Sequence, residues 1–233
     1  MITLRKAQDR GVANFGWLDS KHSFSFGAYY DSAHMGFSAL RVLNDDSVAP
    51  GAGFGTHGHK DMEIISFVIQ GALEHKDSMG NVQSLPKGEF QLMSAGRGVL
   101  HSEYNGSKTQ ALRFLQIWIQ PNAFGGDPGY QQKDFGNHAG LTPIITPNGD
   151  NGTLSIKQDA TISQLVLHLG ESMEVTLDAN RKYYVHQVEG SNTLNKHLLT
   201  CGDGAKIELE SSLVIHNPSE SDTSMALLFD LPA

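Results

Sequence analysis

The sequence predicts an all-β protein with little helix, built from two copies of one β fold. Short apolar segments of strand length recur along the chain between glycine-containing turns, and no segment keeps a long helical period of 3.6 residues. Many short strands with frequent turns are typical of a sandwich or barrel. The glycine content agrees, because 25 of the 233 residues are glycine against a usual share of about 7%.

The strand signals fall into two groups of similar size. In the order of the chain, strands are predicted at residues 37–43, 63–69, 90–93, 113–120, 163–169, 181–188, 206–210 and 227–231. Between residues 121 and 152 the composition shifts to proline, glycine and asparagine, with one short strand signal at 141–145. This segment is interpreted as the connection between two domains, residues 1–135 and residues 136–233.

The composition excludes several classes of protein. A single cysteine, Cys201, rules out a disulfide scaffold and a cysteine-based zinc cluster, and it fits a cytoplasmic location. The formal net charge is −8, whereas a nucleic-acid binder usually carries an excess of basic residues. No apolar run has the length of a signal peptide or of a membrane span. We therefore expect no nucleic-acid partner and no membrane contact.

Two short motifs carry the candidate chemistry. His57 and His59 are two residues apart, and so are His101 and Glu103. On a strand, residues i and i+2 point to the same face, so each pair can converge on one point. If the two strands face one another across a barrel, three imidazoles and one carboxylate meet there.

This ligand set suits a borderline divalent metal such as Fe(II), Mn, Ni, Cu or Zn. Four protein ligands on an octahedral metal leave two positions for water, O₂ or a bidentate substrate, as in a metal-dependent oxygenase. Glu63 competes with Glu103 for the carboxylate role. We rank Glu103 first and expect Glu63 to support the ligands from behind.

The other eight histidines have no partner at ligand spacing and are interpreted as ordinary polar residues. They are His22, His34, His75, His138, His168, His186, His197 and His216. The order of strand, turn and histidine in the second half parallels that in the first, which indicates a weak internal repeat with His216 in the place of His101. Placing Gly190 on Gly71 puts Thr176, Asp178 and Lys182 at the positions of His57, His59 and Glu63. The C-terminal domain is therefore expected to be metal-free.

At these residues the sequence resembles a pirin-type bicupin. The resemblance rests on His22-Ser23-Phe24-Ser25-Phe26, on Leu40-Arg41-Val42-Leu43-Asn44-Asp45-Asp46, and on His57-Gly58-His59-Lys60-Asp61-Met62-Glu63. The first half resembles pirins closely and the second half loosely. Gly71 lies one residue later than the usual first cupin motif places it. The shorter bacterial pirin-like proteins with quercetin 2,3-dioxygenase activity are the most similar group.

The resemblance implies two cupin barrels in tandem, of the jelly-roll or double-stranded β-helix type. It implies one divalent metal per chain in the N-terminal barrel, held by residues matching His57, His59, His101 and Glu103. Iron(II) is the usual metal, with Mn, Ni, Cu, Co or Zn as alternatives. The implied reaction is the opening of the central ring of a flavonol such as quercetin by O₂, with loss of carbon monoxide. As a hypothesis, Glu103 is also the catalytic residue that takes the proton of the substrate 3-hydroxyl.

Two other functions stay open at this point. The same four ligands would serve a non-enzymatic metal- or redox-sensing pirin that acts as a transcription cofactor through protein contact. They would also serve a cupin enzyme acting on another enolic substrate.

Several residues, most of them apolar, either line the lumen or pack the core, and core packing is favoured. They are Phe24, Phe26 and Phe54, with Leu112, Phe114, Gln116 and Trp118 on one strand face. Because closed barrels leave no sheet edge to cover, we expect a monomer.

Overall fold

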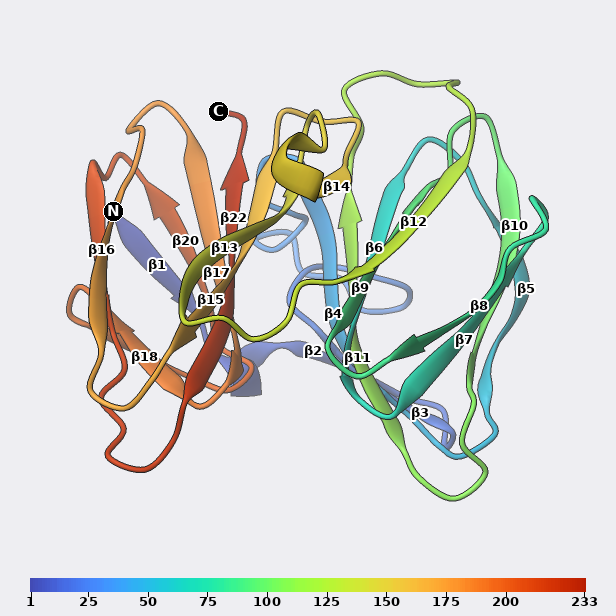
Figure 1. Cartoon of the computed structure of the whole chain (residues 1–233), viewed down its shortest axis with the longest axis horizontal. Coiled ribbons are helices and arrows are strands. Elements are labelled where there is room, and N and C mark those ends of the chain that lie inside the picture. Colours follow the sequence, from blue (N-terminus) through green and yellow to red (C-terminus); the bar gives the residue numbers. More distant parts are fainter. The chain divides into compact units, whose positions relative to one another are not determined.

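A computed structural model describes the whole chain, residues 1–233, and it consists almost entirely of β-strands (Figure 1). The only helical segments are two 3₁₀ turns, Ala7–Asp9 and Asp150–Gly152. The all-β prediction is therefore confirmed. The chain has no helix with the length and apolar character needed to cross a membrane.

The chain divides into two compact units. The N-terminal unit contains Gly11–Gly136 together with the short segment Ile156–Gln158. The C-terminal unit contains Met1–Arg10, Asn137–Ser155 and Asp159–Ala233. The first ten residues thus belong to the C-terminal unit, whereas a division at residue 135 assigns them to the first domain.

The N-terminal unit consists of a seven-stranded sheet in the order β12-β9-β6-β11-β4-β3-β2 and a four-stranded sheet in the order β5-β10-β7-β8. Side chains from both sheets pack in the space between them, which we call the lumen. The strands are β2 (Gly11–Asn14), β3 (Leu18–His22), β4 (Leu40–Val48), β5 (Gly53–His59), β6 (Glu63–Gln70), β7 (Ala72–Asp77), β8 (Val82–Pro86), β9 (Glu89–Ser94), β10 (Val99–Asn105), β11 (Leu112–Ile119) and β12 (Gly129–Asp134).

The C-terminal unit has the same two-sheet plan. Its sheets follow the orders β1-β20-β17-β22-β15-β13-β14 and β16-β21-β18-β19. The strands are β1 (Ile2–Arg5), β13 (Gly140–Thr146), β14 (Leu154–Ser155), β15 (Thr161–Leu167), β16 (Ser172–Thr176), β17 (Lys182–Glu189), β18 (Ser191–Leu194), β19 (His197–Thr200), β20 (Gly204–Glu208), β21 (Ser212–His216) and β22 (Ser224–Leu231).

The two units are repeats of one fold, because their central strands pair in the same order. Gly71 follows β6 and Gly190 follows β17, with φ of +84° and +67°. A Cβ at these glycines would lie 3.1 Å from the Ala111 carbonyl oxygen and 3.0 Å from the Thr223 carbonyl oxygen. Both the left-handed backbone and the close approach require glycine, so the same turn is built twice.

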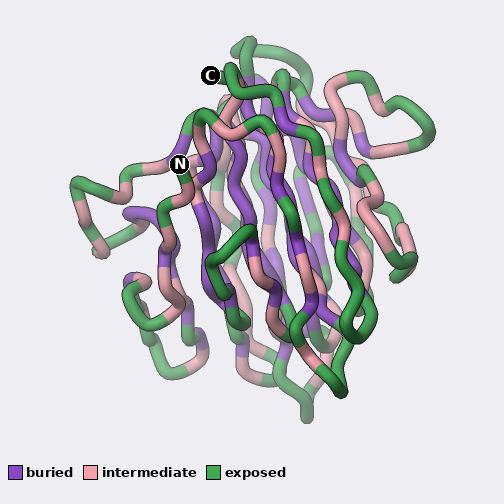
Figure 2. Tube along the Cα trace, turned by 90° about the vertical axis from the view of Figure 1, so that its left-hand side faces the viewer, coloured by how far each residue is buried: buried purple, intermediate pink, exposed green.

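Two inner strands of the seven-stranded sheets, β6 and β17, are buried on both faces, which explains their near-continuous apolar sequences. β6 is buried from Glu63 to Ile69 and β17 from Tyr183 to Val188. Figure 2 shows the buried residues along the middle of the strands, with exposed residues gathered in the loops. In the N-terminal lumen, several buried positions carry polar or charged side chains instead of apolar ones, and these residues form the candidate site.

Candidate metal centre

His57 and His101 lie opposite one another on two neighbouring strands of the four-stranded sheet. β5 and β10 pair antiparallel, with His101 facing His57 and Val99 facing His59. The condition stated from the sequence, that these strands face each other across a barrel, is not met, because they are hydrogen-bonded neighbours. The i, i+2 spacing still brings the three imidazoles together, since it places His57 and His59 on the same face of β5.

The three imidazole rings converge on one small volume. The Nε2 atoms of His57 and His101 are 3.0 Å apart, and the ligand atoms of the three residues all lie within 4.8 Å of one another. The Nδ1 of His57 lies 2.7 Å from the carbonyl oxygen of Gly55, which fixes this nitrogen as a donor and leaves a lone pair on Nε2. Such convergence of nitrogen lone pairs fits a bound cation.

The environment keeps the imidazoles of His59 and His101 neutral near pH 7. Burial, followed by the neighbouring His101 and His57, lowers the pKa of His59 to about 4. Burial, followed by His57 and His75, lowers the pKa of His101 to about 3. A neutral imidazole is the form that binds metal. The Nδ1 of His101 is buried and forms no hydrogen bond, so this nitrogen is free to bind a further group.

Glu103 is buried beside the histidines and is held by three side-chain donors from the opposite sheet. Gln116 Nε2 donates to its Oε2 over 2.9 Å, and Ser66 Oγ donates to its Oε1 over 3.1 Å. Gln91 Nε2 lies 3.4 Å from the same Oε1. These contacts orient the carboxylate in the lumen. Its ligand atom groups with those of His101 and His75 rather than with all three predicted histidines.

His75 is the residue that the sequence interpretation missed. It is 1% exposed on β7, directly opposite Glu103 on β10, and its Nε2 lies 3.0 Å from Asp77 Oδ2. Its Nδ1 is buried and has no hydrogen-bond partner. The signal was present in the sequence, because His75 and Asp77 also have the i, i+2 spacing.

Glu63 is excluded as a ligand by the face of the sheet on which it lies. Ile64 and Ser66 of β6 belong to the lumen face, so Glu63 points to the opposite face. There its Oε2 accepts hydrogen bonds from Ser94 Oγ and from the backbone N–H of Lys157. The expectation that Glu63 supports the ligands from behind is therefore wrong.

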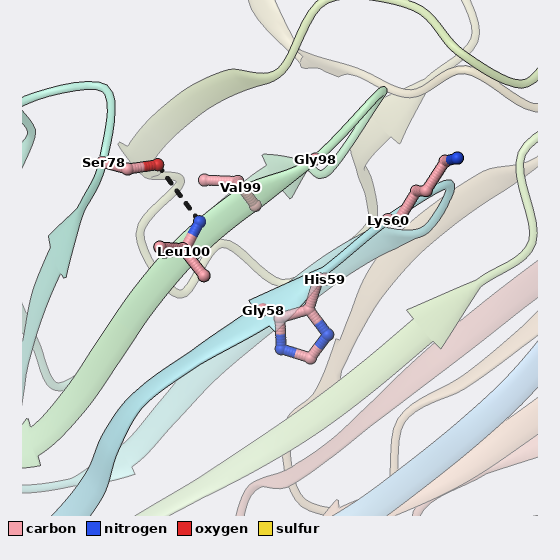
Figure 3. A pocket seen from close by; sticks show the side chains of 7 residues that line it. All are labelled: Gly58, His59, Lys60, Ser78, Gly98, Val99 and Leu100. Atoms are coloured by element: carbon pink, nitrogen blue, oxygen red, sulfur yellow. Dashed lines mark hydrogen bonds between the residues drawn. The ribbon is translucent and has the colours of Figure 1, made fainter.

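Aromatic side chains border the histidines. The ring centroids of Trp118 and His59 are 5.0 Å apart, and those of Trp118 and Phe26 are 5.3 Å apart, both edge to face. Phe24 and Phe114 are fully buried and pack the core, as favoured from the sequence. His59 also lines a hollow of about 390 Å³ between the ends of β5 and β10, shown in Figure 3. The other residues around this hollow are Gly58, Lys60, Ser78, Gly98, Val99 and Leu100.

The C-terminal lumen has aliphatic residues at every corresponding position. Asn105 and Asn217 anchor the comparison, because each side-chain amide donates to three equivalent carbonyl oxygens in its own unit. Counting from them, Leu213 replaces His101, so the placement of His216 at His101 is wrong by three residues. The strand registers then give Val175 for His57, Leu177 for His59, Ile215 for Glu103, Leu194 for His75, Val185 for Ser66, Ala205 for Gln91 and Leu228 for Gln116. All of these residues pack in one hydrophobic cluster.

Two tandem two-sheet barrels, one of them with histidines and a glutamate converging in its lumen, define a two-domain cupin. The pirin family model matches residues 4–119, and the model described as a quercetinase C-terminal cupin domain matches residues 143–231. The chain belongs to the pirin family.

Curated relatives and solved structures match over the full length. A quercetin 2,3-dioxygenase of Escherichia coli is 47% identical over 232 residues, which span 100% of this chain and 99% of the relative. A pirin-like protein of Caulobacter vibrioides is 40% identical over 92% of this chain and 94% of its own. The crystal structure of the E. coli pirin YhhW in complex with nickel(II) has a TM-score of 0.96 at 47% identity and covers 100% of this chain and 99% of that one.

Proposed function

We propose that this protein is a metal-dependent dioxygenase that opens the central ring of flavonols such as quercetin with O₂. The observation that carries the proposal is the convergence of the His57, His59 and His101 nitrogens within 4.8 Å, beside a buried and oriented Glu103. Full-length similarity to a quercetin 2,3-dioxygenase supports the same reaction. In this proposal His57, His59, His101 and Glu103 hold one divalent metal.

The bound metal would supply Lewis-acid chemistry that acidifies the substrate 3-hydroxyl. Glu103 then accepts that proton on a carboxylate oxygen. Before the transfer, Ser66 Oγ donates to Oε1 of Glu103 and Gln116 Nε2 donates to Oε2. The Ser66 hydroxyl can rotate to accept a hydrogen bond once Oε1 carries the proton. The aromatic and aliphatic side chains around the site keep water away from the reacting ring.

The proposal is tested by reconstituting the protein with Fe(II), Mn, Ni, Cu, Co or Zn and measuring O₂ uptake and carbon monoxide release with quercetin. We expect both to occur in a fixed ratio with at least one metal. Absence of O₂ uptake at full occupancy by every one of these metals contradicts the function. It would favour a sensor that uses the same ligands.

The role of Glu103 is tested by Glu103→Gln, which keeps the size of the side chain and removes the proton acceptor. We expect kcat to fall by about 10²–10⁴-fold with the metal still bound. Glu63→Gln is the matched control, because Glu63 is a buried glutamate on β6 of the seven-stranded sheet and points away from the lumen. A Glu103→Gln variant that retains its metal and the wild-type rate contradicts the role of proton acceptor.

Three narrower proposals concern the state of the protein in the cell. Iron(II) is proposed as the native metal because three imidazoles with one carboxylate suit it, and metal analysis after anaerobic purification tests this. A monomer is proposed, and light scattering tests it. A cytoplasmic location without nucleic-acid contact is proposed from the single cysteine and the net charge of −8, and cell fractionation with a DNA-binding assay tests both.

A further inference from the structure

We infer that Trp118 and Asn44 form a polar subsite that holds oxygen atoms of the substrate, an inference that rests on the proposed flavonol function. The two residues lie on the lumen face of adjacent strands of the seven-stranded sheet. Trp118 of β11 pairs with Val42 of β4, and Asn44 of β4 pairs with Gln116 of β11. They are therefore diagonal neighbours, a separation that long side chains bridge.

Trp118 offers a hydrogen-bond donor that the protein does not use. Its Nε1 atom is buried and has no hydrogen-bond partner. An indole N–H can only donate, so the group requires an acceptor oxygen from outside the chain to be satisfied. The ring meets His59 edge to face, with 5.0 Å between the centroids. The indole ring therefore lies beside His59, one of the proposed metal ligands.

Asn44 offers the complementary group. It is 2% exposed, and its Oδ1 is buried without a partner. Its cross-strand partner Gln116 donates to Glu103, so Asn44 is the neighbour of a residue that contacts the proposed proton acceptor. An asparagine amide can accept a hydrogen bond from a hydroxyl or donate one to a carbonyl.

The surroundings of these two groups select the class of ligand. Ile64, Met93 and Val99 form a buried apolar cluster with Trp118, and Phe26 meets the Trp118 ring edge to face at 5.3 Å. Apolar and aromatic surroundings with a few polar groups match an aromatic molecule that carries several oxygens. We assign the Trp118 N–H to an oxygen next to the metal, because it adjoins His59, and the Asn44 amide to a hydroxyl farther along the substrate.

The experiment measures binding to metal-loaded protein under anaerobic conditions, so that turnover does not interfere. Trp118→Phe keeps an aromatic ring and removes the N–H, and Asn44→Leu keeps the volume and removes the amide. Trp17→Phe is the matched control, because Trp17 packs against Phe54 at 5.2 Å in another part of the core. Calorimetry gives the dissociation constants of quercetin and of 3-hydroxyflavone, which keeps the chelating 3-hydroxyl and 4-carbonyl and lacks the other hydroxyls of quercetin.

We expect Trp118→Phe to weaken both ligands about five- to tenfold at unchanged metal content, because one hydrogen bond is lost. Asn44→Leu should weaken quercetin by a similar factor and leave 3-hydroxyflavone unchanged. If both variants bind quercetin as tightly as Trp17→Phe does, while the wild type turns quercetin over, the subsite is wrong and the function stands. If metal-loaded wild type neither binds nor turns over quercetin, both are wrong.

Discussion

In the N-terminal unit, Gln116 donates a hydrogen bond from its Nε2 to Oε2 of Glu103 over 2.9 Å, from the sheet that faces the strand of Glu103. This contact joins the two sheets at the candidate metal centre. It also gives Glu103 one fixed orientation among the several that a glutamate side chain can adopt.

The Gln116→Ala variant should bind metal and turn over substrate less well. Residues that orient a metal ligand typically contribute 10- to 100-fold to metal affinity or activity. We expect a loss in that range, measured by chelator competition and by kcat/KM with quercetin. Gln83→Ala is the control, because Gln83 is exposed on β8. Equal metal affinity in both variants would show that the Gln116 contact does not orient the ligand.

Metal binding should stabilise the protein against thermal unfolding. A ligand that binds only the folded state at 1,000 times its Kd contributes about 4 kcal/mol. We expect Ni(II) to raise the unfolding temperature of the wild type and to raise it much less in His57→Ala. His138→Ala, at an exposed position, should respond like the wild type. A His57→Ala variant with the full response would remove His57 from the ligand set.

Asp46 should make the stability of the metal-free protein fall as the pH rises. Burial raises its pKa to about 7, although the Ser20 hydroxyl donates to it. Between the unfolded pKa of about 4 and pH 7, the folded state keeps a proton that the unfolded state has lost. The free energy of unfolding therefore falls through this range, by on the order of 4 kcal/mol from this group, and then stays level.

Asp46→Asn should remove that contribution. The difference in unfolding free energy between variant and wild type, measured in urea from pH 4.5 to pH 8, should shift in favour of the variant as the pH rises. Asp19→Asn, on the exposed face of β3, is the control. A difference that does not change with pH would show that Asp46 is ionised in the folded protein over the whole range.

Ile215→Glu should destabilise the C-terminal unit instead of creating a second site. Glu103 has three side-chain donors, whereas the residues at their positions around Ile215 are Val185, Ala205 and Leu228. A buried carboxylate without donors costs several kcal/mol. We expect the free energy of unfolding to fall by more than about 3 kcal/mol, measured in urea at pH 7, with less loss at pH 4. Unchanged stability at pH 7 would contradict the aliphatic lumen.

Most of the fold could be predicted from local sequence pattern. The predicted strands at 63–69, 113–120 and 181–188 match β6, β11 and β17 within one residue at each end. These strands have continuous apolar runs that end at turn residues, so the signal is local. Assigning the first ten residues to a unit depends on pairing with strands about 200 residues away, and no local pattern reports that pairing.

The candidate site was predictable where its geometry depends on one strand and not where it depends on pairing. The i, i+2 rule brought His57 together with His59 on β5. It could not show that β5 and β10 are neighbours, nor that His75 on β7 lies opposite Glu103. The misplacement of His216 has a related cause. Matching His216 to His101 by residue type takes no account of loops of different length in the two units. The equivalent hydrogen bonds of Asn105 and Asn217 instead give a structurally fixed position from which residues can be counted.

The position of β1 has a consequence for how the chain folds during its synthesis. Ile2–Arg5 pairs with β20, from Ile2 opposite Ile207 to Arg5 opposite Gly204. β1 therefore leaves the ribosome about 200 residues before its partner strand. The N-terminal unit begins at Gly11 and contains all the predicted metal ligands, so it can close and take up its metal while β1 is still unpaired. The C-terminal unit is then completed only when β1 pairs with β20 across this long sequence separation.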